Sequence, residues 1–332
     1  MSITVKEVAK LAEVSPSTVS RVINDDPRIS EATRKKVIEC IEAIDYQAPV
    51  LSKWHQSRDT YTIGFLTPDI SENFFMNVAA KADETLFKNG YSLLICGTNN
   101  DVRCEKKRIE VLRDKRVDGV IIVPTTSSSS NYEILKQAGI PVVIVDRFVE
   151  NFPADMVMVD NINGAYSAIE FLIDKGASRI GFIGGVKTLS NAQERFKGYE
   201  RALLDYNIQP DREIIKYGDF TEESGYLLAK ALLEIDNPPG FLFVSNYYMH
   251  IGVIRYLTER EENGSVTSVH TASFDDIQFP PLFKHLSVTV RQPIDEIGDT
   301  AAKLMLKRIK NRSSENHYVT KRLKTKLVEY KK

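Results

Sequence analysis

At 332 residues the chain is longer than the roughly 250–300 residues at which a single hydrophobic core stops growing, so at least two folding units are expected. Hydrophobic residues make up 42% of the chain, yet no apolar run approaches the roughly twenty residues that a membrane-spanning helix needs, so a membrane partner is not expected. The 44 basic residues are balanced by 45 acidic ones, so the overall charge gives no indication of a polyanionic partner and only the placement of individual charges could attract one.

The start of the chain, Met1–Glu7, has neither the basic nor the apolar segment of a secretory signal peptide. The three cysteines, Cys40, Cys96 and Cys104, do not have the spacing of metal ligands. We therefore expect a cytoplasmic protein with reduced thiols, no metal and no cofactor.

Residues 4–46 show three short helical patterns and no strand pattern, and Thr4, Ser15 and Ser30 stand where the caps of these helices would be. The apolar residues at helical spacing are expected to form one small core: Val5, Val8, Ala9, Ala12, Val19, Val22, Ile23, Val37, Ile38, Ile41 and Ile44. Only a short turn, Ala12-Glu13-Val14, separates the first two helices. This length is typical of a helix-turn-helix.

The second helix presents polar side chains away from this core, which is typical of a recognition helix in the major groove. Arg21 can read guanine, while short hydroxyl groups and the helix N-terminus suit phosphate oxygens. The expected DNA-binding residues of this unit are Thr4, Val5, Lys6, Ser15, Pro16, Ser17, Thr18, Ser20, Arg21 and Asn24. The alternative is a three-helix packing module that does not touch DNA.

From Tyr61 onward, short apolar runs alternate with helical stretches, which predicts an α/β fold. The predicted strands are Ile63–Thr67, Tyr91–Cys96, Val117–Val123, Pro141–Val145, Arg179–Ile183, Ile214–Tyr217, Phe241–Val244 and Val269–Phe274. They form two similar halves, so we expect two doubly wound parallel sheets with helices on both faces. Ligands of such folds bind beyond the carboxyl ends of the strands.

The segment 4–24, T-V-K-E-V-A-K-L-A-E-V-S-P-S-T-V-S-R-V-I-N, closely resembles the signature of the lactose-repressor/galactose-repressor family of bacterial transcription regulators. Glu13 stands where the family has a turn glycine, and a left-handed conformation there is less favourable for Glu than for Gly. The resemblance continues through residues 29–37 and into the large unit, which looks like the periplasmic ribose-binding proteins. It implies a homodimer that binds operator DNA, with the helix 294–311 in the dimer surface.

The family resemblance also implies where the domains lie. The expected parts are a helix-turn-helix domain (1–46), a hinge linker (47–60) and an effector-binding and dimerisation domain (61–332), whose first lobe covers about 61–160 and 293–322 and whose second lobe covers about 161–292 and 323–332.

The hinge linker departs from the family pattern, because its Pro is shifted to Pro49 and the usual Leu is missing. In the family this Leu is wedged into the minor groove and kinks the DNA. Leu51 or Trp54 could take its place, and both are added to the expected DNA-binding residues. The alternative is a hinge without a wedge.

Ten residues match the pocket positions of the sugar-binding fold. The expected effector-binding residues are Phe74, Phe75, Asp146, Arg147, Gln193, Arg195, Phe220, Asn246, Asp275 and Gln292. The alternative for Phe74 and Phe75 is that they pack in the core on the apolar face of a helix and do not contact a ligand. Tyr247 stands where relatives usually have Asp, which implies a bulkier rim or a different ligand.

The expected function is repression of a carbohydrate-utilisation operon under the control of a small neutral sugar, with ribose or another pentose as the first candidate. A purine or a phosphorylated protein partner is an alternative effector, and a sugar-binding transport protein is the alternative from another class. An enzyme is not expected, because the chain has no nucleophile elbow, phosphate-binding loop or metal-binding His pair.

Overall fold

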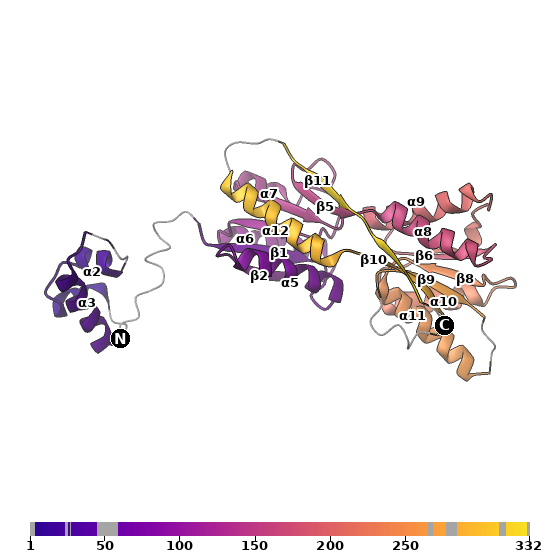
Figure 1. Cartoon of the computed structure of the whole chain (residues 1–332), viewed down its shortest axis with the longest axis horizontal. Helices are drawn as coiled ribbons and strands as arrows, with labels where there is room; N and C mark the ends of the chain where they lie inside the picture. Colours follow the sequence, from indigo (N-terminus) through magenta and orange to yellow (C-terminus); the bar gives the residue numbers. More distant parts are fainter. Residues whose placement is uncertain are drawn as a thin grey trace. The chain divides into compact units, whose positions relative to one another are not determined.

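The computed structural model describes residues 4–23, 26, 28–44, 59–264, 268–276, 284–311 and 317–330. The chain divides into two compact units, residues 1–61 and 62–332, which are described one at a time (Figure 1).

The small unit contains three helices, α1 (Val5–Leu11), α2 (Pro16–Ile23) and α3 (Glu31–Ala43). Thr4 forms a capping box with Glu7 at the start of α1, as expected from its position. The hydroxyl oxygens of Ser15 and Ser30 accept hydrogen bonds from Thr18 N (3.1 Å) and Thr33 N (3.3 Å), so they cap α2 and α3.

The core of the small unit contains most of the predicted apolar residues, with Val8, Val19 and Val37 completely buried. The expectation for Ile38 is wrong: its side chain is 42% exposed, because it follows Val37 by one helical step and turns toward solvent. The turn residue Glu13 has a φ of 51°, in the left-handed region that glycine occupies more easily. Its carboxylate also receives the Lys36 ammonium at 2.9 Å, which ties the turn to α3.

The large unit contains two six-stranded sheets, in the orders β11-β5-β4-β3-β1-β2 and β12-β10-β9-β8-β6-β7. The first consists of β1 (Thr62–Thr67), β2 (Ser92–Gly97), β3 (Gly119–Ile122), β4 (Val142–Val145), β5 (Asp155–Val159) and β11 (Thr320–Leu323). The second consists of β6 (Ile180–Gly184), β7 (Ile215–Tyr217), β8 (Phe241–Val244), β9 (His270–Phe274), β10 (Leu286–Arg291) and β12 (Lys326–Glu329). We call the parts built on these sheets the first and second lobes.

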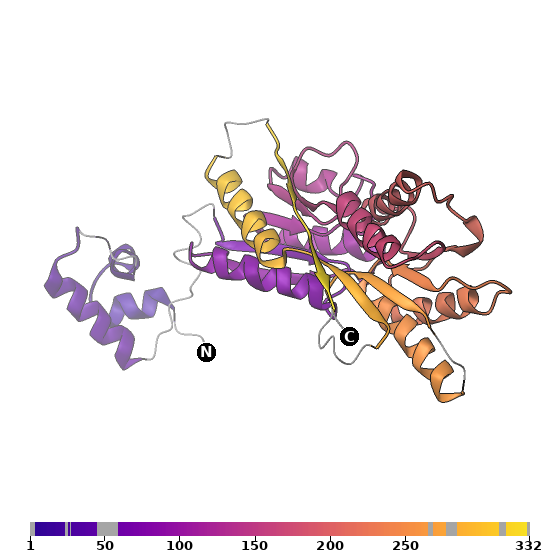
Figure 2. The same ribbon diagram turned by 45° about the vertical axis from the view of Figure 1, so that its right-hand side comes forward.

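Helices cover both faces of each sheet, as expected for doubly wound folds. In the first lobe α5 (Asn73–Phe87) and α12 (Ile294–Lys310) pack on one face, and α6 (Val102–Asp114) and α7 (Glu133–Gln137) on the other (Figure 2). In the second lobe α8 (Asn161–Asp174) and α9 (Ser190–Asp205) lie opposite α10 (Glu222–Leu233) and α11 (Tyr247–Glu262), and a short 3₁₀ helix (Arg212–Ile214) precedes β7.

The predicted strands all appear, and the expectation of an α/β sensor with two sheets is confirmed. The sequence patterns missed β5, β10, β11 and β12. Both β11 and β12 are short edge strands that carry Lys or Arg at exposed positions, so they lack the apolar run that predicted the others. The second sheet also departs from purely parallel pairing, because β12 runs antiparallel to β10.

The chain crosses between the lobes after β5, after β10 and after β11. These segments join the two lobes of the large unit (Figure 1). Such multiple connections permit hinge closure of two lobes around a ligand.

Helix α12 is the one that the family resemblance placed in a dimer surface. Its apolar side chains, among them Ile297, Ala301 and Met305, are buried within the first lobe against α5 and the sheet. Glu296 and Lys303 of the same helix are exposed, and a place of α12 in a dimer surface stays a prediction.

Candidate functional site

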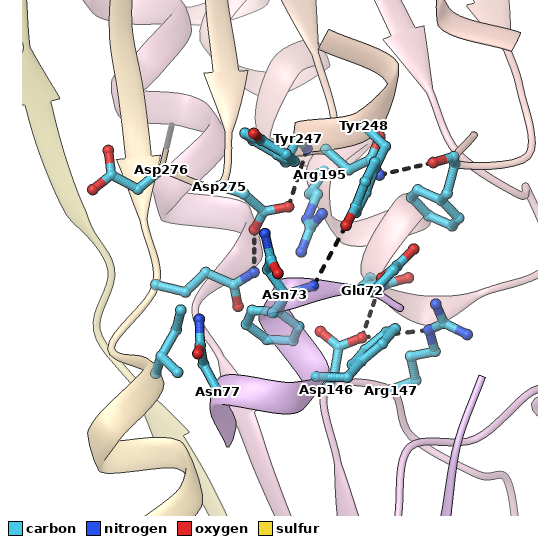
Figure 3. Close-up of a pocket in the computed structure, with 17 residues that line it drawn as sticks. Glu72, Asn73, Asn77, Asp146, Arg147, Arg195, Tyr247, Tyr248, Asp275 and Asp276 are labelled. Carbon is cyan, nitrogen blue, oxygen red and sulfur yellow. Dashed lines mark hydrogen bonds and ion pairs between the residues drawn. The ribbon is translucent and has the colours of Figure 1, made fainter. Parts of the chain in front are cut away.

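A cavity of ≈ 200 Å³ lies between the two lobes, where strands of both sheets end (Figure 3). This volume is below the roughly 300–1,000 Å³ of pockets for drug-sized ligands, so the cavity suits a smaller molecule. Its lining comprises Glu72, Asn73, Phe74, Phe75, Asn77, Asp146, Arg147, Asn191, Arg195, Phe220, Asn246, Tyr247, Tyr248, Asp275, Asp276, Gln292 and Ile294.

All of the predicted effector-binding residues except Gln193 line this cavity. Gln193 is exposed on α9, and its side-chain amide donates to the carbonyl of Lys187. The helix turns by about 100° per residue, so Gln193 faces away from the cavity that Asn191 and Arg195 reach. The placement of Gln193 in the pocket is therefore corrected, and Asn191 lies there in its stead.

Asp146 and Arg147 follow β4 and are both almost completely buried, with 4% and 5% of their surfaces exposed. Asp146 Oδ2 accepts a hydrogen bond from Asn191 Nδ2 (2.9 Å) and lies 3.4 Å from Arg147 Nε. Burial raises the pKa of Asp146 and lowers the pKa of Arg147, because it penalises both charged forms. Asp146 Oδ1 is buried without a hydrogen-bond partner in the described part of the chain.

Arg195 is buried, and three protein groups hold its guanidinium in place. Its Nε donates to Asn161 Oδ1 (2.9 Å), its Nη1 donates to the carbonyl of Ser245 (2.6 Å), and its guanidinium lies 3.8 Å from the centre of the Phe274 ring. It therefore contributes a rigid positive charge to the wall of the cavity.

Asp275 and Gln292 lie at the ends of β9 and β10 and are hydrogen-bonded to each other through Gln292 Nε2. The other carboxylate oxygen of Asp275 accepts from Tyr247 N (3.3 Å). Gln292 is 5% exposed, and its Oε1 has no partner among the described residues. Because Asp146 Oδ1 is also unpartnered, the cavity contains two buried acceptors that need donors from a ligand.

The aromatic walls of the cavity come from both lobes. Arg147 lies 5.9 Å from the centre of the Phe75 ring and 5.7 Å from that of Phe220. Phe75 is only 3% exposed and also belongs to the core of the first lobe, whereas Phe74 is half-buried against that core. Phe75 is therefore both a core residue of the first lobe and a residue that lines the cavity.

Sequence reasoning missed several lining residues, notably Glu72, Asn191 and Tyr248. Tyr248 belongs to the second lobe, yet its hydroxyl lies 3.4 Å from Asn73 N and 3.3 Å from the Ser71 carbonyl of the first lobe. Burial raises the pKa of Glu72 to about 7, and the neighbouring carboxylates act in the same direction. Glu72, Asn191 and Tyr248 each lie at the start of a helix that follows a strand, and this position in the sequence could have indicated that they line the cavity.

The small unit presents the expected polar face on α2, where Ser15, Pro16, Ser17 and Arg21 are exposed. Thr18 and Ser20 are half-buried on the same helix. At the start of α1, Thr4 and Lys6 are exposed, while Val5 packs against the core. Asn24, Leu51 and Trp54 lie outside the described residues.

Within the described residues no helix is long and apolar enough to cross a membrane. The same part of the chain contains no group of His, Cys, Asp and Glu side chains that could hold a metal ion.

Two family models match the chain. One, described as bacterial regulatory proteins of the lacI family, matches residues 4–48. The other, described as periplasmic binding proteins and sugar-binding domain of the LacI family, matches residues 60–330.

Among curated proteins, the chain is 30% identical to the HTH-type transcriptional repressor PurR of Vibrio atlanticus, over 94% of this chain and 93% of that protein. Among solved structures, the regulator CelR in complex with cellobiose has a TM-score of 0.73 at 26% identity, over 98% of each chain. A LacI family regulator from Enterococcus faecium with bound ribose has a TM-score of 0.70 at 29% identity, over 81% of this chain and 97% of that one.

Proposed function

The chain belongs to the LacI family of bacterial regulatory proteins, and from this premise we propose that it represses transcription and that a small sugar in the cavity controls its affinity for operator DNA. The relatives are regulators of transcription, so the chain is a regulator and not an enzyme. Because a DNA-binding regulator works on the chromosome, we place it in the cytoplasm.

The observation that carries the sugar proposal is the pair of buried acceptors, Asp146 Oδ1 and Gln292 Oε1, in a small aromatic-walled cavity. Sugar hydroxyls donate hydrogen bonds to such acceptors, and aromatic rings pack on the apolar face of a sugar ring. Similar solved regulators contain ribose or cellobiose, and the small volume favours a monosaccharide. Ribose, as a pentose, remains the first candidate to test.

A purine is the second candidate, because one relative has the name HTH-type transcriptional repressor PurR. Its flat ring would stack on Phe74 and Phe220, and its amino groups would donate to the same acceptors. A phosphorylated ligand is less suitable, because carboxylates outnumber guanidinium groups around the cavity and would repel the phosphate.

We infer that the repressor is a homodimer, since a single helix-turn-helix makes few contacts and two-fold proteins match palindromic operators. The proposed contact includes the edge strand β2, where Ile95 is 43% exposed, and the start of α6, where Val102 is 44% exposed. An edge strand with apolar side chains is a natural surface for a second copy to cover.

The proposal is tested by calorimetry and thermal shift on the full chain with a panel of pentoses, hexoses and nucleobases. A ligand that binds the folded state raises the melting temperature, and we expect a sugar to do so. Asp275→Ala should lose about 1.5–3 kcal/mol of binding, the contribution of a charged hydrogen bond.

The matched control is Asp236→Ala, which removes an exposed carboxylate elsewhere in the second lobe and should bind as the unaltered chain does. If nucleobases bind and no sugar does, the proposed ligand is a purine and not a sugar. Undiminished sugar affinity in Asp275→Ala would contradict the assignment of this cavity.

A further inference from the structure

The charges around the cavity do not balance. Glu72, Asp146 and Asp275 contribute carboxylates, whereas only Arg147 and Arg195 contribute guanidinium groups. Asp276 also reaches the lining, but its carboxylate is bound by groups outside the cavity lining, namely Arg291 (2.5 Å), Thr289 (3.0 Å) and Tyr330 (2.5 Å). One carboxylate is therefore in excess when all of these groups are ionised.

The excess carboxylate is that of Glu72. Asp146 is paired with Arg147 and bonded to Asn191, and Asp275 accepts hydrogen bonds from Tyr247 N and Gln292. The side chain of Glu72 makes no hydrogen bond among the described residues and does not cap α5. It projects into the cavity near Arg147, Asp146 and Tyr248 (Figure 3).

We propose that the ligand of this cavity is an aminated sugar whose protonated amine lies against Glu72, an inference that rests on the sugar-binding function proposed above. The ammonium would cancel the excess negative charge, and its donors complement a cavity whose unpartnered buried oxygens are acceptors.

Neither arginine forms an ion pair or a hydrogen bond with Glu72 among the described residues. Arg195 donates to Asn161 and to the Ser245 carbonyl, and Arg147 donates to the Pro124 carbonyl (3.0 Å) while lying beside Asp146. Turning either guanidinium group toward Glu72 would leave these buried carbonyl partners unsatisfied. Arg147 Nε is itself buried without a hydrogen-bond partner among the described residues, so it can donate to a hydroxyl of the same sugar.

The aromatic lining supports the same ligand class. Phe74, Phe220, Tyr247 and Tyr248 surround the cavity, and an ammonium group is attracted to the faces of such rings. At these rings a neutral sugar would gain from stacking, whereas an aminated sugar would gain from stacking and from its charge.

The groups that face Glu72 also determine the pH dependence of binding. Burial and the carboxylates of Asp275, Asp69 and Asp146 raise the pKa of Glu72 to about 7, and Arg147 opposes them. Glu72 must lose its proton to pair with an ammonium, so affinity for an aminated sugar should rise with pH below 7. The rise should approach about tenfold per pH unit, the limit for release of one proton.

The experiment is calorimetry on the full chain with D-glucosamine, D-galactosamine and D-mannosamine, each against its parent hexose, and with D-ribose. We expect one aminated sugar to bind at least about tenfold more tightly than its parent. Glu72→Gln should abolish that preference and the rise in affinity between about pH 5.5 and 7, where amines of pKa roughly 7.7–8.0 stay protonated. Glu84→Gln, an exposed change on the same helix, should retain both.

Equal or tighter binding of ribose or of a parent hexose would overturn this inference and leave the proposed function standing. An amine preference that persists in Glu72→Gln would overturn the role of Glu72. Failure of every sugar to bind would overturn the inference and the proposed function together.

Discussion

Three residues that line the cavity have left-handed backbone conformations: Asp146 (φ 68°), Phe220 (φ 72°) and Asp275 (φ 77°). Such values are uncommon outside glycine and unfavourable for a residue as bulky as Phe. Each residue directly follows or lies near the end of a strand, so the conformation turns its side chain into the space between the lobes. The local strain is thus located where the ligand is proposed to bind.

The sequence predicted most lining residues because strand ends can be recognised from apolar runs, as for Asp146 after β4 and Asp275 after β9. It did not predict Glu72 or Tyr248, because their role depends on facing the opposite lobe. It chose Gln193 over Asn191 since helical phase relative to the cavity is fixed only by how α9 packs.

Arg21 is the residue on which specific DNA recognition is expected to depend. Arg21→Ala should reduce affinity for the preferred operator by about 1–3 kcal/mol, because it removes a bidentate contact to guanine, and should leave ligand binding unchanged. Fluorescence anisotropy with an operator selected from random DNA measures both specific and non-specific affinity. The control Lys35→Ala changes an exposed cation on α3. Unchanged operator affinity in Arg21→Ala would contradict the recognition-helix assignment.

At the scale of elements, the first turn of α9 joins the lobes. Ser190 Oγ accepts from Phe148 N (3.0 Å), Asn191 donates to Asp146 (2.9 Å), and Glu194 binds Arg322 of β11 (2.9 Å). Asp146 therefore binds α9 through Oδ2, while Oδ1 has no partner among the described residues. If Oδ1 binds the proposed ligand, ligand binding and contact between the lobes depend on one carboxylate.

Helices α10 and α11 approach closely enough that glycine is required between them. A Cβ at Gly252 would lie 1.9 Å from the Glu222 carbonyl, whereas a Cβ at Gly240 would meet nothing within 4 Å. Gly252→Ala should therefore destabilise the fold by about 1–3 kcal/mol through overpacking, and Gly240→Ala should not. Urea unfolding followed by circular dichroism measures the difference. Equal midpoints for the two variants would show that α11, which carries Tyr247 and Tyr248, is not held this tightly.

At the scale of the whole molecule, the fold class follows from patterns that repeat, namely three capped helices and then alternating strands and helices. The crossings between the lobes do not, because the last two depend on β11 and β12, which carry no apolar run and pair with strands far back in the chain, β11 with β5 and β12 with β10. These crossings make the lobes one body that can close on a ligand. The described residues do not include Leu51 and Trp54, so the wedge in the hinge linker stays a prediction.

The central claim is that a ligand in the cavity controls DNA binding. By linkage, ligand and operator must change each other's affinity by the same factor. The direct measurement is operator affinity of the full chain, by fluorescence anisotropy, with and without a saturating concentration of the sugar that binds. We predict a change of at least about fivefold, the lower end of typical coupling, and a smaller change in Asp275→Ala at the same concentration, because that variant binds the sugar more weakly. Operator affinity of the unaltered chain that stays the same at saturation would contradict the claim.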